Sequence, residues 1–275
     1  MLLKRILVGV LCAVIAAGSV YYGATYRFYD KPLSQKVQEE FEAQISLPDN
    51  FVLAASSECY NDVKNTMQAV HDSVNSGAYA IELDVSFAED STPYLAEGSE
   101  YITEVSVPLE KVFEKYAGEP NLRYVLRIMN FRNQEKLLAL AQQYDLLSRI
   151  LLTGFSRTDL AQHASDYAAF PIAADLDTAY KDLHDVIECR DLLSAYRNDG
   201  AGLLLVSINQ MTPELHQAVN GFVHLPLAIQ DVQSEYDMYH ALSYNPRMII
   251  TDRPDALYDI LFNGDHIDFE HYDSF

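Results

Sequence analysis

The sequence predicts a (β/α)8 barrel of the TIM type that is preceded by an N-terminal transmembrane helix. Three observations support this. Eight short apolar runs alternate with eight helical patterns over about 210 residues. An uncharged apolar stretch at 6–24 follows Lys4 and Arg5. The chain has 275 residues, of which 49% are hydrophobic, and this is enough for one sizeable core but short for two domains.

The apolar runs have the length and composition of buried strands. They lie at 51–55, 80–85, 124–129, 150–153, 170–174, 202–206, 226–229 and 248–251. The helical patterns lie at 65–76, 109–116, 133–144, 157–164, 182–196, 213–219, 233–242 and 254–262. Capping residues stand just ahead of Pro213 and Pro254, so both prolines are expected to open a helix at a strand-to-helix corner. We therefore expect a strand followed by a helix, eight times over.

The first 29 residues read as a cytoplasmic tip and a membrane anchor. Nineteen helical residues at 6–24 span about 28 Å, close to the thickness of a hydrocarbon core, and the leading positive charges keep the N-terminus cytoplasmic. This predicts a single-pass protein of the cell membrane whose barrel is extracytoplasmic. The alternative is a signal peptide that is cleaved near small residues such as Ala16, which gives a secreted protein. A juxtamembrane linker or helix at 30–50, a barrel at 51–263 and an acidic tail at 264–275 complete the organisation.

Charge and cysteine content limit the partners further. Forty acidic residues against 19 basic ones give a formal net charge of -21 and a pI near 4.5, and this field repels phosphate backbones. Nucleic acid is therefore not an expected partner. Cys59 and Cys189 are the cysteines outside the membrane segment. An exported location permits a disulfide between them, and two unrelated buried thiols are the alternative.

The run at 80–85 contains two carboxylates inside an otherwise apolar strand. Glu82 and Asp84 are two residues apart, so their side chains point to the same side of the strand. Two buried like charges are costly unless a cation joins them. Because chemistry in such barrels sits where the strands end, one mouth is expected to gather a set of strand-end residues. These are Ala55, Glu82, Asp84, Arg127, Gly154, Gln230 and Asp252.

Several segments resemble the glycerophosphodiester phosphodiesterase family, in family order and spacing. The second-strand motif of that family matches 77–85 (GAYAIELDV), and its closing motif matches 248–254 (MIITDRP). Asn65-Thr66 matches the Asn-Thr that opens its first helix, and 107–113 and 154–156 match two further motifs. The resemblance runs from about Phe51 to Leu261. It implies a TIM barrel and phosphoric diester hydrolase chemistry of lipid metabolism.

The catalytic residues that the resemblance implies are degenerate in this chain. The family uses two histidines as general acid and base, and their positions fall on Ala55 and Glu97. The acid that opens the first helix falls on Lys64. An alanine cannot transfer a proton, and Glu97 needs a strongly raised pKa to act as an acid. The resemblance therefore implies a pseudoenzyme with no confidently assigned catalytic residue.

The metal site that the resemblance implies is also incomplete. Glu82 and Asp84 remain as vestigial ligands, and the third ligand position falls on Arg127. A guanidinium forks onto carboxylates in a planar geometry, so we expect Arg127 to replace the cation. Lys64, Asn65 and Asp252 are expected as further mouth residues.

Two functions follow as expectations. The first is a membrane-anchored binding or structural module without a cofactor, whose protein or lipid-headgroup partner is not specified by the sequence. The second is an active phosphodiesterase that hydrolyses glycerophosphodiesters with Ca2+ or Mg2+, through Glu82, Asp84 and Glu97.

Overall fold

The computed structural model describes residues 47–57, 59, 64–96, 106–177 and 185–262. The predicted membrane segment at 6–24, Glu97 and the tail at 264–275 lie outside these residues. Within the described parts of the chain, no helix is both long and apolar enough to span a lipid bilayer.

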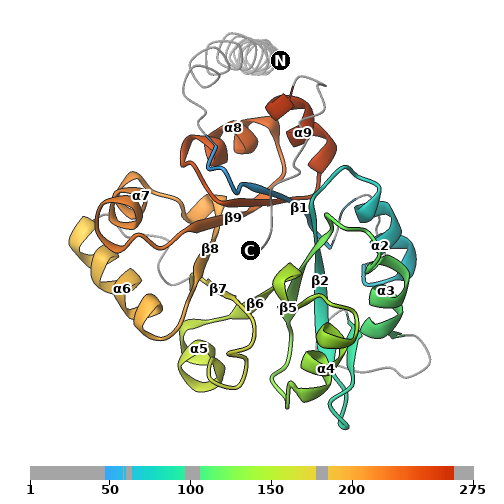
Figure 1. The fold of residues 1–275 in the computed structure, drawn as a ribbon. Helices are drawn as coiled ribbons and strands as arrows, with labels where there is room; N and C mark the ends of the chain where they lie inside the picture. The colour runs from blue at the N-terminus through green and yellow to red at the C-terminus, as the bar shows by residue number, and fades with distance from the viewer. Residues whose placement is uncertain (1–46, 58, 60–63, 97–105, 178–184, 263–275) are drawn as a thin grey trace, which may run out of the picture. The chain divides into compact units, whose positions relative to one another are not determined.

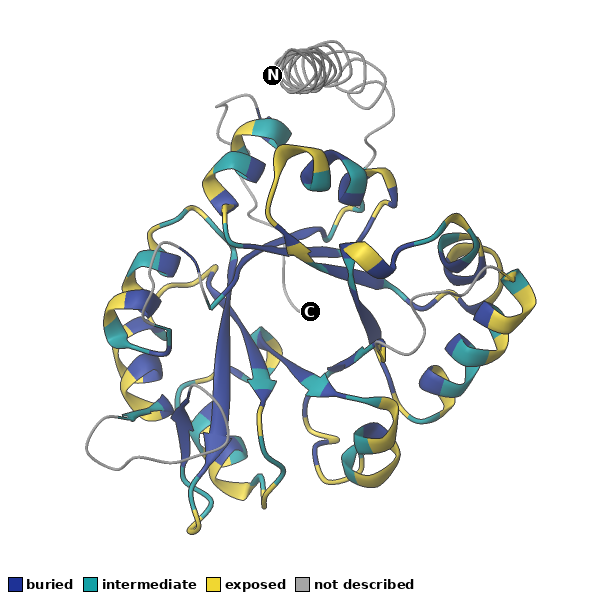
Figure 2. Ribbon diagram, turned by 180° about the vertical axis from the view of Figure 1, so that it is seen from behind, coloured by how far each residue is buried: buried dark blue, intermediate teal, exposed yellow. Residues whose placement is uncertain are grey.

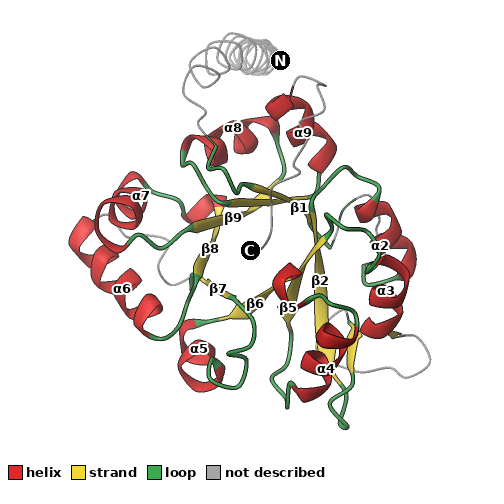
Figure 3. Ribbon diagram, in the orientation of Figure 1, coloured by secondary structure: helices red, strands yellow, loops and turns green. Residues whose placement is uncertain are grey.

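Eight parallel strands form a closed barrel, which confirms the predicted barrel fold (Figures 1 and 3). The strands are β1 (Val52–Ala55), β2 (Ala80–Phe87), β5 (Arg123–Ile128), β6 (Ile150–Phe155), β7 (Ile172–Asp175), β8 (Leu203–Ser207), β9 (Leu227–Val232) and β10 (Met248–Thr251). Neighbours in the sheet follow the order β1-β10-β9-β8-β7-β6-β5-β2, and a β1–β2 pairing joins the two ends. In that pairing Ala54 lies opposite Ala80 and Ala55 opposite Ile81.

A helix follows each barrel strand and lies outside the ring of strands (Figure 3). The helices are α2 (Met67–Val74), α3 (Leu109–Tyr116), α4 (Glu135–Gln143), α5 (Arg157–His163), α6 (Val186–Asn198), α7 (Pro213–Ala218), α8 (Glu235–Ser243) and α9 (Pro254–Phe262). Short helical turns occur at η1 (Leu147–Arg149), η3 (Ile208–Gln210) and η4 (Val219–Val223), the last of them a π-helix. Pro213 and Pro254 open α7 and α9 as expected from the sequence.

Two short strands were not predicted. β3 (Pro93–Leu95) pairs antiparallel with the end of β2, and β4 (Val107–Pro108) pairs antiparallel with β3. They extend the sheet beside β2, which itself runs two residues beyond the predicted end, to Phe87. Strands of three and two residues are too short to show an alternating pattern, so sequence periodicity could not detect them.

The barrel strands are mostly buried (Figure 2), and one apolar cluster draws on all eight of them. Its members are Val52, Ala54, Ala80, Val125, Leu151, Ala173, Leu203, Leu205, Ala228, Met248 and Ile250. Side chains from eight strands around a ring can meet in one cluster only inside that ring. The alternation of side chains then fixes which residues continue this inward row beyond the cluster toward the carboxyl ends of the strands.

Several inward rows become polar just beyond the cluster. Ala80 is followed two residues later by Glu82 and then by Asp84, and Val125 by Arg127. The same step leads from Ala54 to Ser56, from Ala173 to Asp175, from Ala228 to Gln230 and from Ile250 to Asp252. An apolar plug thus closes the barrel below, and a polar layer forms the floor of the mouth above it.

The two cysteines in the described residues are buried and are not joined by a disulfide. Cys59 follows β1, whereas Cys189 lies in α6 on the outer layer. Burial raises the pKa of the Cys59 thiol to about 12, which keeps it protonated and unreactive at neutral pH. Of the two alternatives that the sequence left open, the structure therefore shows two separate buried thiols.

Gly154 lets strand β6 approach β5 closely at the mouth. Its φ of +86° lies in the left-handed region that favours glycine. A Cβ atom at this position would lie 2.6 Å from the backbone oxygen of Ile128 and 2.9 Å from its backbone nitrogen. Neither backbone atom can move without shifting β5.

We predict that Gly154→Ala lowers the free energy of unfolding by about 2–4 kcal/mol, because it adds both a left-handed strain and a backbone clash. Urea denaturation followed by circular dichroism measures this change. Gly118→Ala is the matched control, since a Cβ at Gly118 meets nothing within 4 Å and φ there is not positive. Equal losses in the two variants would contradict the proposed packing role of Gly154.

Candidate functional site

Two neighbouring cavities open at the carboxyl ends of the barrel strands. The first chamber has a volume of about 150 Å³ and lies over β1, β2, β9 and β10. It is lined by Ser56, Ser57, Lys64, Glu82, Asp84, Arg127, Gln230, Asp231, Gln233, Ile250 and Asp252. The second chamber has a volume of about 600 Å³ and lies over β6 to β9. It is lined by Arg127, Gly154, Ser156, Asp159, Asp175, Leu176, Asp177, Ser207, Asn209, Gln210, Gln230 and Asp231.

Three residues, Arg127, Gln230 and Asp231, line both chambers, so the two are adjoining parts of one mouth. The linings together contain seven carboxylates and two cationic side chains, Arg127 and Lys64. The mouth is therefore strongly acidic. A volume of about 600 Å³ lies in the usual range of small-molecule pockets, whereas the first chamber is below it.

Glu82 is deeply buried on the floor of the first chamber, with a side chain that is 4% exposed. Burial raises the pKa of Glu82 to about 7, and Asp84 adds to the rise, while Arg127 and a hydrogen bond from the Ser57 backbone N–H oppose it. Its Oε1 atom has no hydrogen-bond partner. The first chamber thus contains a carboxylate whose charge is only partly compensated by the protein.

Asp84 lies two residues further along β2 and is 8% exposed. The Asn65 side-chain amide donates to Asp84 Oδ2 at 3.2 Å and to the Ala96 carbonyl at 2.8 Å. Asn65 adopts a left-handed backbone with φ of +57°, which asparagine tolerates better than most residues. The Oδ1 atoms of Asp84 and Asn65 are buried and have no partner. With Glu82 Oε1, three buried acceptor oxygens therefore lack a donor.

Arg127 lies on β5, where it is paired in register with Asp84 of β2. Burial acts to lower the pKa of Arg127, but the carboxylates of Glu82, Asp175, Asp84 and Asp231 outweigh it, so the pKa is raised overall. The hydrogen-bonded fork that we expected is not formed: among the described residues, no ion pair within 4.0 Å involves Arg127. Arg127 therefore acts on the carboxylates through space rather than by direct contact.

Asp175 and Asp231 were missed by the sequence reasoning. Asp175 is the last residue of β7, one position beyond the predicted strand end, and burial raises its pKa although Arg127 opposes the rise. The Gly154 backbone N–H donates to Asp175 Oδ1 at 3.3 Å. Asp231 has a left-handed backbone with φ of +61° within β9. For Asp175 the available signal was the same as for Glu82: an acid that continues an inward-facing row at a strand end. Asp231 is out of phase with the inward row of β9 and reaches the mouth where the β9–β10 register is irregular, which the sequence does not indicate.

Asp252 lies in the first chamber and is held by two neighbours. The Ser56 hydroxyl donates to Asp252 Oδ1 at 2.5 Å, and the Gln233 amide donates to its Oδ2 at 3.3 Å. Ser56 belongs to the inward row of β1, whereas Ala55 is fully buried and lines neither chamber. The expectation that Ala55 reaches the mouth is therefore wrong, because alternation along β1 turns it to the other face.

The other expected mouth residues are also placed by the structure. Lys64 and Gln230 line the first chamber, and Gly154 lines the second. Glu97 lies outside the described residues. The mouth thus brings together the expected strand-end residues other than Ala55, and Asn65 contacts Asp84 without lining either chamber.

The described residues of the mouth are a poor donor set for a divalent cation. Among the described residues, no group of three or more His, Cys, Asp or Glu side chains is arranged to hold a metal ion. Calcium takes six to eight oxygen ligands and magnesium an octahedron, so two carboxylates beside a guanidinium are a poor set. The raised pKa of Arg127 keeps that guanidinium charged.

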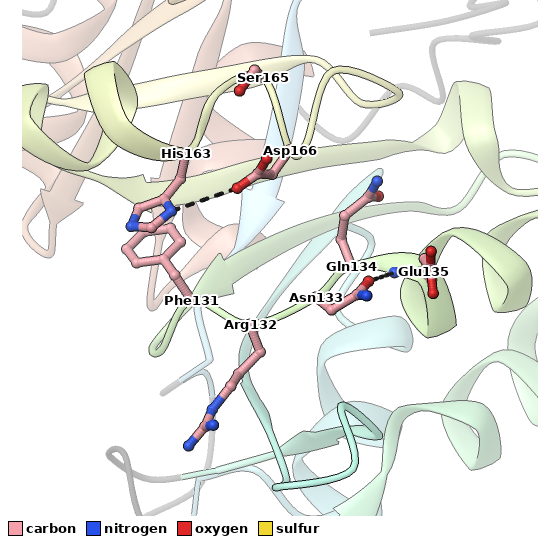
Figure 4. A pocket seen from close by; sticks show the side chains of 8 residues that line it. All are labelled: Phe131, Arg132, Asn133, Gln134, Glu135, His163, Ser165 and Asp166. Carbon is pink, nitrogen blue, oxygen red and sulfur yellow. Dashed lines mark hydrogen bonds and ion pairs between the residues drawn. The ribbon is translucent and has the colours of Figure 1, made fainter.

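A third cavity of about 520 Å³ lies apart from the two chambers, beside the start of α4 and the end of α5 (Figure 4). His163 lines it, stacks on Phe131 with ring centroids 4.5 Å apart, and faces Asp166 at 3.8 Å. Neither chamber of the mouth has a histidine among its lining residues in the described chain. His163 therefore lies outside the mouth.

We predict that Glu82→Gln stabilises the fold more at about pH 8 than at about pH 5. Because the pKa of Glu82 rises from 4.5 to about 7 on folding, the folded state keeps a proton that the unfolded chain loses between these values. The wild-type free energy of unfolding therefore falls as pH rises through this window. Glu82→Gln lacks this pH-dependent fall. We therefore expect the difference in free energy of unfolding between variant and wild type to shift in favour of the variant by on the order of 2 kcal/mol from about pH 5 to about pH 8.

Urea denaturation at the two pH values measures the effect. Glu89→Gln is the control, because Glu89 follows the same strand but is exposed. A Glu82→Gln effect that is the same at both pH values would show that this carboxyl is not titrating on folding.

The sequence matches no protein-family model and no curated protein. Solved structures do match the fold. One is from Galdieria sulphuraria and is assigned as a glycerophosphodiester phosphodiesterase: TM-score 0.64, 15% identity, covering 77% of this chain and 97% of that one. A glycerophosphodiester phosphodiesterase from Parabacteroides distasonis matches with a TM-score of 0.60 at 15% sequence identity. This match covers 78% of this chain and 97% of the Parabacteroides chain.

A phosphodiesterase from Oleispira antarctica, solved in complex with the product sn-glycerol-3-phosphate, gives a TM-score of 0.56 at 11% identity. The match covers 80% of this chain and 98% of the Oleispira chain. At such low identities the likeness concerns the fold. The described barrel has the fold of the glycerophosphodiester phosphodiesterases.

Proposed function

We propose that this chain is a binding module built on a glycerophosphodiester phosphodiesterase-like barrel, and that it does not hydrolyse phosphodiesters. The observation that carries this proposal is the position of Arg127. It stands among four carboxylates at the mouth, beside Glu82 and Asp84, where the family resemblance implies a metal ligand. The protein thus supplies a fixed cation of its own in place of a metal ion.

The chemistry of the mouth supports the same proposal. The family resemblance implies two histidines that act as general acid and base. The lining residues of the described chambers include no histidine. A phosphodiester anion in either chamber would also face a surplus of carboxylates, which disfavours its binding.

We further propose that 6–24 anchors the module in the cell membrane with the barrel outside the cytoplasm. This rests on the uncharged apolar run and the Lys4 and Arg5 that precede it. A partner would then be a protein or a ligand that is reachable at the membrane surface. Secretion after cleavage of a signal peptide is the other arrangement that this segment supports.

One observation favours an active phosphodiesterase as the second candidate. Glu82 and Asp84 both face the first chamber and both have an unpartnered oxygen, as ligands of a metal ion would. A pKa near 7 also makes Glu82 able to exchange a proton at neutral pH. This candidate requires a metal ion to bind despite Arg127.

Hydrolysis distinguishes the two candidates. We expect the full-length chain to release no product from glycerophosphocholine or glycerophosphoethanolamine, with calcium or with magnesium, above the background of Glu82→Gln. Coupled detection of glycerol 3-phosphate and of the free alcohol measures release. Turnover by the wild type that is lost in Glu82→Gln would refute the non-hydrolytic proposal.

Arg127→Glu tests the role of the internal cation. The change removes a positive charge and adds a third acid to Glu82 and Asp84, so we expect calcium binding to appear or to tighten by about tenfold or more. Calorimetric titration of wild type and variant measures this. Arg132→Glu is the control, because Arg132 follows the same strand and undergoes the same charge change but is exposed.

Tight calcium binding by the wild type would argue against Arg127 as a replacement cation. Equal calcium affinities of the wild type and Arg127→Glu would also argue against that role of Arg127.

A further inference from the structure

We infer that the mouth binds a small polar ligand through a primary ammonium group, which the first chamber holds against Glu82 and Asp84. This inference rests on the proposed non-hydrolytic binding function and names the class of ligand. Its starting point is two buried oxygens of residues that line the first chamber and have no hydrogen-bond partner, Glu82 Oε1 and Asp84 Oδ1. A buried acceptor without a donor is costly, so such oxygens mark the place of a ligand donor.

The two carboxylates are well placed to receive that donor. Glu82 and Asp84 are 4% and 8% exposed, and both line the first chamber. The Ser57 N–H donates to Glu82 and the Asn65 amide donates to Asp84 Oδ2, whereas Glu82 Oε1 and Asp84 Oδ1 have no partner. A primary ammonium carries one positive charge and three N–H donors. It therefore matches both the charge and the hydrogen-bonding deficit of the floor.

Arg127 does not remove this deficit. It forms no ion pair within 4.0 Å among the described residues, and its charge is shared by Glu82, Asp84, Asp175 and Asp231. The first chamber alone is lined by four carboxylates and by two cations. The surplus of negative charge is what an added ammonium would neutralise.

The lining also selects the type of amine. A quaternary ammonium has no N–H donor and is recognised by aromatic faces. None of the lining residues of either described chamber is aromatic. The rest of the ligand would extend past Arg127 into the second chamber, where the hydroxyls of Ser156 and Ser207 and the amides of Asn209 and Gln210 line the wall. Hydroxyl groups on the ligand suit that wall.

Ethanolamine and choline form a matched pair of probes, because they differ only in methylation of the nitrogen. We expect ethanolamine to bind the full-length chain about tenfold or more tightly than choline, since choline cannot satisfy the buried oxygens. Ligand-observed NMR titration at constant ionic strength measures both affinities. Equal binding of the two amines, or no ethanolamine binding, would overturn the inference.

Variants locate the site. Glu82→Gln and Asp84→Asn should each weaken ethanolamine binding by about tenfold, whereas the exposed Glu89→Gln should leave it unchanged. Circular dichroism of each variant verifies folding. Unchanged binding in a folded Glu82→Gln would contradict the inference. Hydrolysis is measured separately. Turnover of glycerophosphoethanolamine would refute the proposed non-hydrolytic function. Equal binding of ethanolamine and choline without turnover would refute only the proposed ammonium site.

Discussion

Closure of the barrel between β1 and β2 is the constraint on which the rest of this structure depends. The pairing of Ala54 with Ala80 and of Ala55 with Ile81 joins the two ends of the sheet. It removes the free edges that an open sheet would expose and brings the carboxyl ends of eight strands to one mouth. Because β2 is then held between β1 and β5, the inward row of β2 is buried from both sides. Glu82 and Asp84, the two carboxylates of that row, are therefore held away from solvent.

The buried carboxylates set the electrostatic character of the mouth. Glu82 and Asp84 lose hydration on burial, and the Arg127 guanidinium stabilises their charges without forming an ion pair with them. Such an arrangement lowers the cost of the charges without filling their hydrogen-bonding capacity. Polar residues of the mouth therefore remain available for a ligand, while the apolar cluster below carries the stability of the barrel.

The barrel could be predicted from sequence because its strands are buried on both faces and so appear as uninterrupted apolar runs. β3 and β4 could not, because three and two residues show no periodicity. Glu82, Asp84 and Arg127 were found because charged residues inside an apolar strand are conspicuous. Asp175 and Asp231 follow the predicted strand ends at 174 and 229, where acids also occur on ordinary surfaces, so only the closed ring shows that they face the mouth. The separation of Arg127 from the carboxylates depends on side-chain geometry, which no sequence pattern contains.

Arg127 borders both chambers, and this position has a thermodynamic consequence. A charged group that enters one chamber changes the potential at the shared guanidinium, and the other chamber responds to that change. The free energies of occupying the two chambers are therefore linked, and by reciprocity each occupant alters the affinity for the other by the same factor. A single shared side chain would thus couple the binding of charged ligands in two adjoining cavities.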